Sequence, residues 1–543
     1  MMSLCPSRYN HLVVKHAAVL LVVASLLACS SLLAQTPAAG NTMVVLPFEN
    51  TSPTPGLEWI GESFPETFHE QLNSPVLYVA SRDERLRAYD REGVPAGVHA
   101  SRATLYRIAE QMDVDYAVLG SYRYDGSRLT VTAQLLDMRA PRLLPAATES
   151  APLADLGALQ SELAWDLLHS IRADFPLAKE KYVANVAPIR LDALQNYIRG
   201  ILATTAEEKI QHYREATKLN PDYAQAWLAL GKTYYAQHAY EPAISALSQV
   251  QQSGAMSGAI AREANFYLGL AALAHGDFAK SESAFEFVAA RLPLAEVYNN
   301  LGVVAARRGH SPKKVAEYFE RAIQDDPSDS DYHFNLAVTL EQSGDRAGAA
   351  RELRATLDRH PNDADAKMLL EAQAPAAGGI VPSSATSKFP SERIKRNYEE
   401  DAFRQMTTQM ASWSEQQFIK SDPRTHSRYH LELGKELLAH GFTTEAEAEF
   451  RHAAAVDPAS PAPLAALAED FNARGDAHEA RAQAEASLRI RESAAAYLIL
   501  ARLDLQENKA ESAFQNVTRA LQLEPGNPAG QDLKRKLAEK AQP

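Results

Sequence analysis

The sequence predicts an α+β protein in which a small α/β domain at residues 41–175 precedes an all-α superhelix of repeated helix pairs in two blocks. Three observations lead to this fold class. β-Rich runs alternate with helical spacing in residues 41–175. One pattern of Leu, Gly, Ala and Pro then recurs about every 34 residues. A stretch rich in Pro, Gly, Ala and Ser interrupts that pattern.

The chain begins with the features of an exported protein. Basic residues precede an apolar run at 17–27, as in a secretory signal. The run is shorter than the roughly 20 residues that a membrane-spanning helix needs. We therefore expect a signal segment at residues 1–34. Three outcomes stay open: a lipobox with lipidation of Cys29, ordinary signal-peptidase cleavage after Ala34, and an uncleaved anchor.

The composition is that of an acidic globular protein. Of the 543 residues, 46% are hydrophobic and 23% charged, and the formal net charge is −13. This balance argues against nucleic-acid binding, which needs Lys and Arg to neutralise phosphates. The two cysteines are Cys5 and Cys29, so we expect no disulfide in the processed chain. Membrane contact is expected only through a lipid anchor.

The front domain is expected to be an α/β layer. Strands are predicted where β-branched and aromatic residues cluster, at 42–48, 76–80, 115–122 and 128–136. Helices are predicted where apolar residues recur three or four apart, at 59–72, 105–112 and 156–171. Asp125-Gly126, between the last two strands, predicts a hairpin.

Three short motifs give this domain a family resemblance. Val45-Leu-Pro-Phe-Glu-Asn50 is followed by a helix with Trp59-Ile-Gly-Glu62, and then by Asp113-Val-Asp-Tyr-Ala-Val-Leu-Gly-Ser121 with its hairpin. The arrangement resembles the N-terminal domain of TolB and its CsgG- and FlgO-like relatives, over about a quarter of the chain. That resemblance implies a bacterial envelope location and contacts with proteins rather than catalysis.

The repeats are recognised because the same spacing between small residues, aromatic residues and Pro recurs along the chain. A small residue such as Gly231 lets the two helices of a pair approach closely, and Pro ends the second helix. We expect five repeats at 189–371, the first of them shortened, and three at 428–540 with a C-terminal helix. Trp227 is expected to be buried between the helices of its pair. The expected core residues are Trp227, Leu230, Gly231, Tyr234, Gly269, Gly302 and Gly434.

This pattern resembles the tetratricopeptide repeat over more than half of the chain. The resemblance implies a groove that is lined by the first helix of each pair and binds peptides or helices of other proteins. No Lys and Asn stand four apart on these helices, as they do in co-chaperone repeats that bind an acidic C-terminus. The expected groove residues are Lys232, Tyr235, Phe266, Asn299, Arg307, Phe334, Glu341, Lys435, Asn472 and Arg502.

Two segments separate the repeat blocks. Residues 372–393 are expected to be a flexible linker because of their Pro, Gly, Ala and Ser content. Residues 394–427 are expected to form an amphipathic helix outside the repeat pattern, with an apolar face of Ile394, Tyr398, Phe403, Met406, Met410 and Trp413. That helix is interpreted as a cap on the next repeat, with a partner-binding helix as the alternative.

No catalytic constellation emerges from the sequence. Gly61-Glu-Ser-Phe-Pro65 begins like a nucleophile elbow, but Pro replaces the closing Gly and the motif lies in a predicted helix. The histidines read as scattered, without carboxylate or Cys partners at metal-ligand spacing. We therefore predict a protein that is not an enzyme, with no catalytic residue, no metal and no cofactor.

These observations together predict a non-catalytic protein–protein interaction scaffold. Its partners are expected to be proteins or peptides, and its location the periplasm or, through a lipid anchor, the outer membrane of a Gram-negative-type bacterium. The alternative is a ligand-binding sensor, or an enzyme or transport accessory, that acts through the front domain. The partner, the repeat face that binds it, and the oligomeric state are left open.

Overall fold

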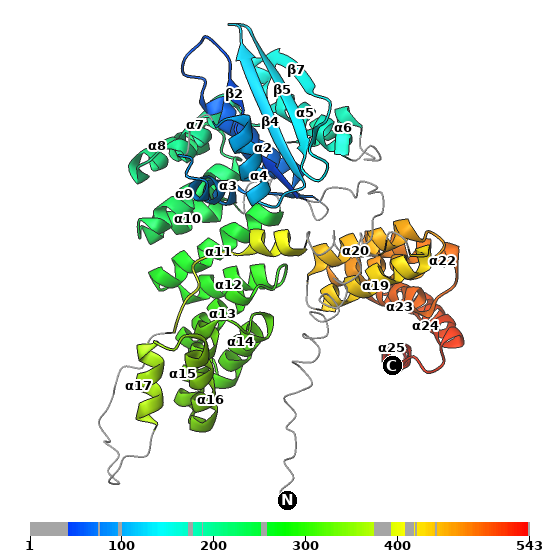
Figure 1. The fold of residues 1–543 in the computed structure, drawn as a ribbon. Helices are drawn as coiled ribbons and strands as arrows, with labels where there is room; N and C mark the ends of the chain where they lie inside the picture. Colours follow the sequence, from blue (N-terminus) through cyan, green and yellow to red (C-terminus); the bar gives the residue numbers. More distant parts are fainter. Residues whose placement is uncertain are drawn as a thin grey trace, which may run out of the picture. The chain divides into compact units, whose positions relative to one another are not determined.

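A computed structural model gives the fold of the chain (Figure 1). It describes residues 42–73, 77–95, 100–171, 178–186, 188–250, 258–373, 392–407, 418, 421–439 and 442–540. Several predictions fall outside these residues: the signal segment with Cys29, most of the linker, and the Met410 and Trp413 positions of the amphipathic helix.

The front domain contains one mixed β-sheet, with seven strands in the described residues. The strands are β1 (Thr42–Val45), β2 (Glu49–Asn50), β3 (Tyr78–Val79), β4 (Tyr116–Tyr124), β5 (Arg128–Asp137), β6 (Arg142–Leu143) and β7 (Ala147–Pro152). β1 lies between β3 and β4 and is parallel to both, whereas β4 and β7 flank β5 antiparallel to it. Gly126 in the predicted hairpin has a φ of +102°, which glycine adopts without strain.

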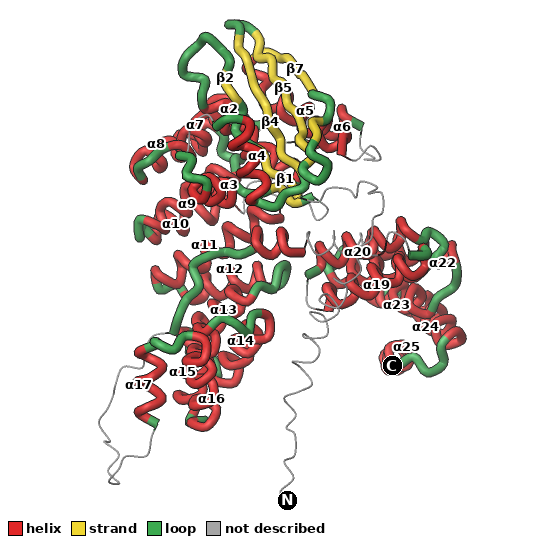
Figure 2. The backbone as a smooth tube through the Cα atoms, in the orientation of Figure 1, coloured by secondary structure: helices red, strands yellow, loops and turns green. Residues whose placement is uncertain are grey.

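Helices cover both faces of this sheet (Figure 2). They are α2 (Trp59–Leu72), α3 (Arg82–Arg91), α4 (Arg102–Gln111), η1 (Leu153–Asp155), α5 (Leu156–Ile171) and α6 (Lys179–Asn185). Side chains alternate along β1: Met43 and Val45 pack with α2 and α5, and Val44 packs with α3 and α4. The predicted strands and helices are found, while α3 and β7 were not predicted.

Most of the rest of the described chain is helical and forms helix pairs, with α17 and α25 as single helices at the ends of the two blocks. The front block consists of α7 (Leu191–Leu202), α8 (Ala206–Leu219), α9 (Ala224–Ala236), α10 (Tyr240–Val250), α11 (Gly258–His275), α12 (Phe278–Ala289), α13 (Ala295–Arg307), α14 (Pro312–Asp325), α15 (Ser330–Ser343), α16 (Arg346–Arg359) and α17 (Ala364–Ala372). The rear block consists of α19 (Pro423–Ala439), α20 (Thr443–Val456), α21 (Ala462–Ala473), α22 (Ala477–Ile490), α23 (Ala494–Gln506), α24 (Ala510–Leu523) and α25 (Pro528–Lys540). In the front block each pair also packs on the next.

One packing device recurs in both blocks. A Cβ atom added at Gly302 would lie 2.5 Å from the ring of Phe319, and one added at Gly434 would lie 2.5 Å from the ring of Phe450. Both phenylalanines are fully buried. Gly231 and Gly269 are crowded in the same way by the second helix of their own pairs. The predicted close approach of paired helices at these glycines is therefore confirmed.

Trp227 departs from its prediction. It is only half-buried and packs on the edge of a core that includes Leu230 and Tyr234. Its indole N–H donates to the carbonyl of Pro221 at 2.8 Å, at the loop between α8 and α9. The polar edge of the ring must reach this loop, which keeps part of the ring at the surface.

The segment before the rear block also differs from its prediction. Residues 392–399 have no regular structure, and helix begins at Glu400 rather than at Ile394. α19 begins at Pro423, inside the range expected for the amphipathic helix. Within the described ranges, no helix is long and apolar enough to cross a membrane.

Candidate functional site

Three buried asparagines mark the candidate site. Asn299 and Asn300 lie on α13 and Asn335 lies on α15, and all three are 0% exposed. Their carboxamides bind residues 393 and 395 of a loop that runs alongside the front block (Figure 2). The first helices of the pairs therefore hold a segment of the same chain.

The asparagines pair with the backbone of alternate residues. The N–H of Arg393 donates to Asn335 Oδ1 at 2.7 Å, and its carbonyl accepts from Nδ2 of Asn335 and of Asn299 at 2.8 and 2.9 Å. The N–H of Lys395 donates to Asn300 Oδ1 at 2.9 Å, and its carbonyl accepts from Asn300 Nδ2 at 2.8 Å. A carboxamide offers both a donor and an acceptor, so it can satisfy both backbone groups of one residue. We call Asn299, Asn300 and Asn335 the asparagine ladder.

Acidic side chains receive the two basic residues of the segment. The Arg393 guanidinium lies 3.6 Å from the centre of the Phe334 ring and pairs with Asp363 at 2.6 Å and Asp331 at 3.1 Å. Lys395 Nζ lies 2.7 Å from Asp331. The hydrogen bond from Arg393 is the main reason that the pKa of Asp363 falls to about 2. Side-chain recognition here thus favours cations, and the ladder recognises the backbone.

The later part of the segment is bound by buried groups on α11 and α13. The N–H of Glu399 donates to Glu296 at 3.0 Å, and burial raises the pKa of Glu296 to about 7. The Tyr398 ring packs on Phe266, with 5.0 Å between ring centres. Arg262 pairs with Glu400, where the Nε to Oε2 distance is 3.0 Å, and both residues are buried.

A cavity of about 640 Å³ lies beside the segment. Ile394 and Arg396 line it from the segment side, and Tyr235, Phe278 and Arg307 line it from the repeats. Residues 394 and 396 alternate with the two residues that the ladder holds, as the period of two in an extended chain requires. The cavity is therefore lined by the residues that alternate with Arg393 and Lys395, whereas the side chains of those two residues pair with Asp363 and Asp331.

The structure brings some of the expected groove residues together and leaves others apart. Phe266, Asn299 and Phe334 contact the segment, and Arg307 pairs with Glu392 at 2.8 Å. Tyr235 lines the cavity together with Ile394 and Arg396 of the segment. The others are engaged elsewhere: Lys232 pairs with Glu263, Glu341 with Gln373, Lys435 with Glu432 and Arg502 with Glu469, and Asn472 is half-buried. Partner binding at these ten positions stays a prediction.

The sequence interpretation missed the other members of the site. Asn300, Asn335, Glu296, Asp331 and Asp363 were not selected. One signal was present, because Asn335 follows Asn299 by 36 residues, close to one repeat. The two side chains are hydrogen-bonded to each other at 2.7 Å.

The motif that began like a nucleophile elbow is part of the core. Ser63 is 0% exposed in α2, donates to the carbonyl of Ile60 at 2.7 Å and accepts from Gln160 at 2.8 Å. Neighbouring Glu62 is paired with Arg82 and Arg85. These contacts give Ser63 a role in packing.

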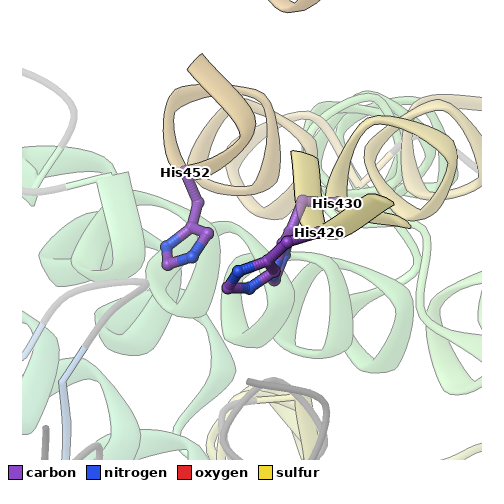
Figure 3. Close-up of side chains that lie close together, drawn as sticks. All are labelled: His426, His430 and His452. Carbon is purple, nitrogen blue, oxygen red and sulfur yellow. The ribbon is translucent and has the colours of Figure 1, made fainter. Parts of the chain in front are cut away.

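The view of the histidines as scattered is wrong. His426, His430 and His452 lie together in the first helix pair of the rear block (Figure 3). His430 also has a carboxylate partner, Glu449. The sequence interpretation missed this cluster because it began the rear block at residue 428, whereas α19 begins at Pro423 and includes His426.

Family models match parts of the chain. A model described as TPR repeat matches residues 207–237, and two described as tetratricopeptide repeat match residues 266–330 and 310–372. The predicted tetratricopeptide repeats are thereby confirmed in these ranges. None of the three models reaches the front domain, so its resemblance to TolB and its relatives is not confirmed. No curated protein matches the chain significantly.

Solved repeat structures also resemble parts of the chain. YrrB, described as a TPR protein with an unusual peptide-binding site, is 19% identical at a TM-score of 0.29, covering 33% of this chain and 90% of its own. MamA is 22% identical at a TM-score of 0.29, covering 35% of this chain and 98% of its own. PilF of Pseudomonas aeruginosa is 16% identical at a TM-score of 0.19, covering 51% of this chain and 97% of its own.

Proposed function

We propose, from the tetratricopeptide repeats at 207–237 and 266–372, that this chain is a non-catalytic scaffold that binds extended segments of other proteins. Such repeats generally mediate protein–protein interactions. The observation that carries the proposal is the asparagine ladder, which pairs both backbone groups of Arg393 and of Lys395. Because these bonds go to backbone atoms, a segment of another protein can form them equally well.

The side chains beside the asparagine ladder indicate which residues a bound segment should carry. Asp331 and Asp363 favour a segment with two basic residues separated by one position. Phe266 favours an aromatic residue three positions after the second basic residue, as Tyr398 follows Lys395. In this proposal, residues 392–400 occupy the groove until a partner with similar chemistry replaces them.

A peptide titration tests this function. The full-length protein would carry Arg393→Ala and Lys395→Ala to weaken its own segment, and a fluorescent peptide with the sequence of residues 391–404 would be added. We expect saturable binding by fluorescence anisotropy. A peptide methylated at the backbone nitrogens of Arg393 and Lys395 should bind at least about tenfold more weakly, since each lost hydrogen bond contributes about 1 kcal/mol.

A matched groove variant provides the control. Asn300→Ala with Asn335→Ala, in the same weakened background, should reduce binding of the unmodified peptide by a similar factor. Equal binding of the methylated and unmethylated peptides would refute backbone recognition by the ladder.

We further propose that the protein acts in the bacterial envelope. This proposal is supported by the basic residues near the N-terminus and by the apolar run at 17–27 that follows them. Residues 1–40 fused to a reporter that is active only in the periplasm should give activity, and a cytosolic reporter would contradict export. Mass spectrometry of the mature N-terminus would separate lipidation at Cys29 from cleavage before Gln35.

A further inference from the structure

The rear block contains a cluster of three imidazoles. His426 and His430 are four residues apart on α19, one helical turn, so both lie on one face. His452 reaches the same place from α20 (Figure 3). One ring nitrogen from each histidine lies within 4.8 Å of the others, and His426 and His430 are buried.

One of the three rings is oriented by a carboxylate. His430 Nδ1 lies 2.6 Å from Glu449 Oε2. If Nδ1 carries the proton, it donates to this carboxylate, and the lone pair is then on Nε2. A carboxylate bound to the second nitrogen is the usual companion of a metal-bound histidine, because it fixes the tautomer and the ring orientation.

The front block contains a second His–Glu pair that can be compared with His430 and Glu449. His333 Nδ1 lies 2.8 Å from Glu352 on the equivalent helices α15 and α16, with the same separation of 19 residues along the chain. Counting by the same offset, Asp329 and Ala355 stand where the rear block has His426 and His452. The His–Glu pair is therefore shared by these two helix pairs, whereas the convergence of two further imidazoles is found at α19 and α20 and not at α15 and α16.

Three imidazoles are a donor set for a transition metal. Zn²⁺ is bound by histidine nitrogens at about 2.0–2.1 Å, and three histidines with one open position is a known zinc arrangement. Tetrahedral geometry at those distances places the nitrogens about 3.4 Å apart. Small rotations of the three rings would bring nitrogens that lie within 4.8 Å to that spacing. Mg²⁺ and Ca²⁺ prefer oxygen ligands, which this cluster does not provide.

We propose that His426, His430 and His452 bind one Zn²⁺ ion that joins α19 to α20, with the fourth coordination position open. Glu449 acts as a positioning residue for His430. Because the two helices form the first pair of the rear block, the ion would stabilise the end at which that block begins. Zinc binding is then coupled to the folding of this pair, since the site requires both helices in place.

The test uses the full-length protein without a polyhistidine tag, stripped of metal by a chelator and then titrated with Zn²⁺ alone. Competition with a chromogenic chelator should show one tight site per chain. His452→Gln and His426→Gln should each weaken that site more than about tenfold. Glu449→Gln should weaken it about 10- to 100-fold, as is usual for the partner of a metal-bound histidine.

The front block supplies the matched controls. His333→Gln and Glu352→Gln remove the equivalent pair and should leave zinc affinity and stoichiometry unchanged. Circular dichroism would verify that each variant is folded, and Co²⁺ bound to the parent should give a tetrahedral visible spectrum that His452→Gln loses. The proposal is overturned if the parent has no site tighter than the His452→Gln variant, or if the His333→Gln variant loses as much affinity as the His452→Gln variant.

Discussion

The two repeat blocks have the same framework of paired helices. They differ in which residues their polar side chains contact. In the front block, α13 and α15 present buried asparagines that hold residues 393 and 395. In the rear block, the expected groove residues Lys435 and Arg502 form ion pairs with nearby carboxylates, and a histidine cluster lies between α19 and α20. The repeat motif thus specifies the helix pair, and binding chemistry depends on positions that the motif leaves free.

The largest expected effect tests whether the framework is the same in both blocks. Phe319→Ala and Phe450→Ala each empty a fully buried position against a glycine, so each should lower the free energy of unfolding by about 3–5 kcal/mol. Hydrogen exchange should rise first in the block that carries the change, because repeats contact only their neighbours. Trp227→Ala should cost less, since that ring is half-buried. Uniform loosening of both blocks by either change would contradict independent local packing.

The second prediction concerns the polar contacts that distinguish the blocks. Asn335→Ala leaves the N–H of Arg393 without its partner, and an unsatisfied buried group costs about 1–3 kcal/mol. Tryptic cleavage after Arg393 and Lys395 should accelerate by roughly 5- to 150-fold, following the population of the released segment. Asn472→Ala in the rear block is the matched control and should leave this cleavage rate unchanged. An unchanged rate in Asn335→Ala would mean that the ladder does not hold the segment.

The third prediction is a pH dependence confined to the front block. Glu296 has a pKa of about 7 when the segment buries it, against 4.5 when it faces water. Between these values the released state binds fewer protons than the docked state, so raising the pH should favour release. Burial is the largest influence on the pKa of Glu296; the backbone N–H of Glu399 lowers that pKa, and the charges of Glu399 and Asp326 raise it.

Tryptic cleavage between pH 5 and pH 8, corrected with a model peptide, would measure this effect. Glu296→Gln should remove the dependence, because glutamine mimics the protonated carboxyl at every pH. A dependence that persists in Glu296→Gln would assign it to another group.

The smallest changes in stability should come from substituting the two basic groove residues of the rear block, Lys435 and Arg502. Lys435→Ala and Arg502→Ala break ion pairs in which the partner carboxylates are more than half exposed, and each should change the free energy of unfolding by less than about 1 kcal/mol. Chemical denaturation would measure this. A loss above 2 kcal/mol would show that these side chains support the fold.

The packing of the helices could be read from the sequence because it depends on local offsets. Gly302 and Gly434 stand 17 and 16 residues before Phe319 and Phe450, the aromatic residues that fill the space they leave, so the offset is nearly constant. The strands around Asp125-Gly126 were also predictable, because turn chemistry and alternation are properties of neighbouring residues.

The site could be predicted only in part because its contacts are remote in the chain. Asn299 was selected from its helix position, but Arg393, the residue that it binds, is 94 positions away. The spacing of Ile394, Tyr398 and Phe403 fits a helix, yet residues 392–399 are not helical. The groove carboxamides take the backbone hydrogen bonds of residues 393 and 395, which a helix would otherwise use. The histidine cluster was missed for a different reason: the rear block was expected to begin at residue 428, which placed His426 outside the helix that carries His430.

The covalent connection between the groove and its occupant has a consequence for competition. Residues 374–391 join α17 to the segment, so the segment cannot diffuse away when it is released. A tether of this length produces an effective local concentration on the order of millimolar. A free peptide that binds only as well as residues 392–400 would therefore have to reach that concentration to fill half of the grooves. A partner at cellular concentrations must bind more tightly, for instance by also filling the cavity beside Tyr235 and Phe278, or must present several segments at once.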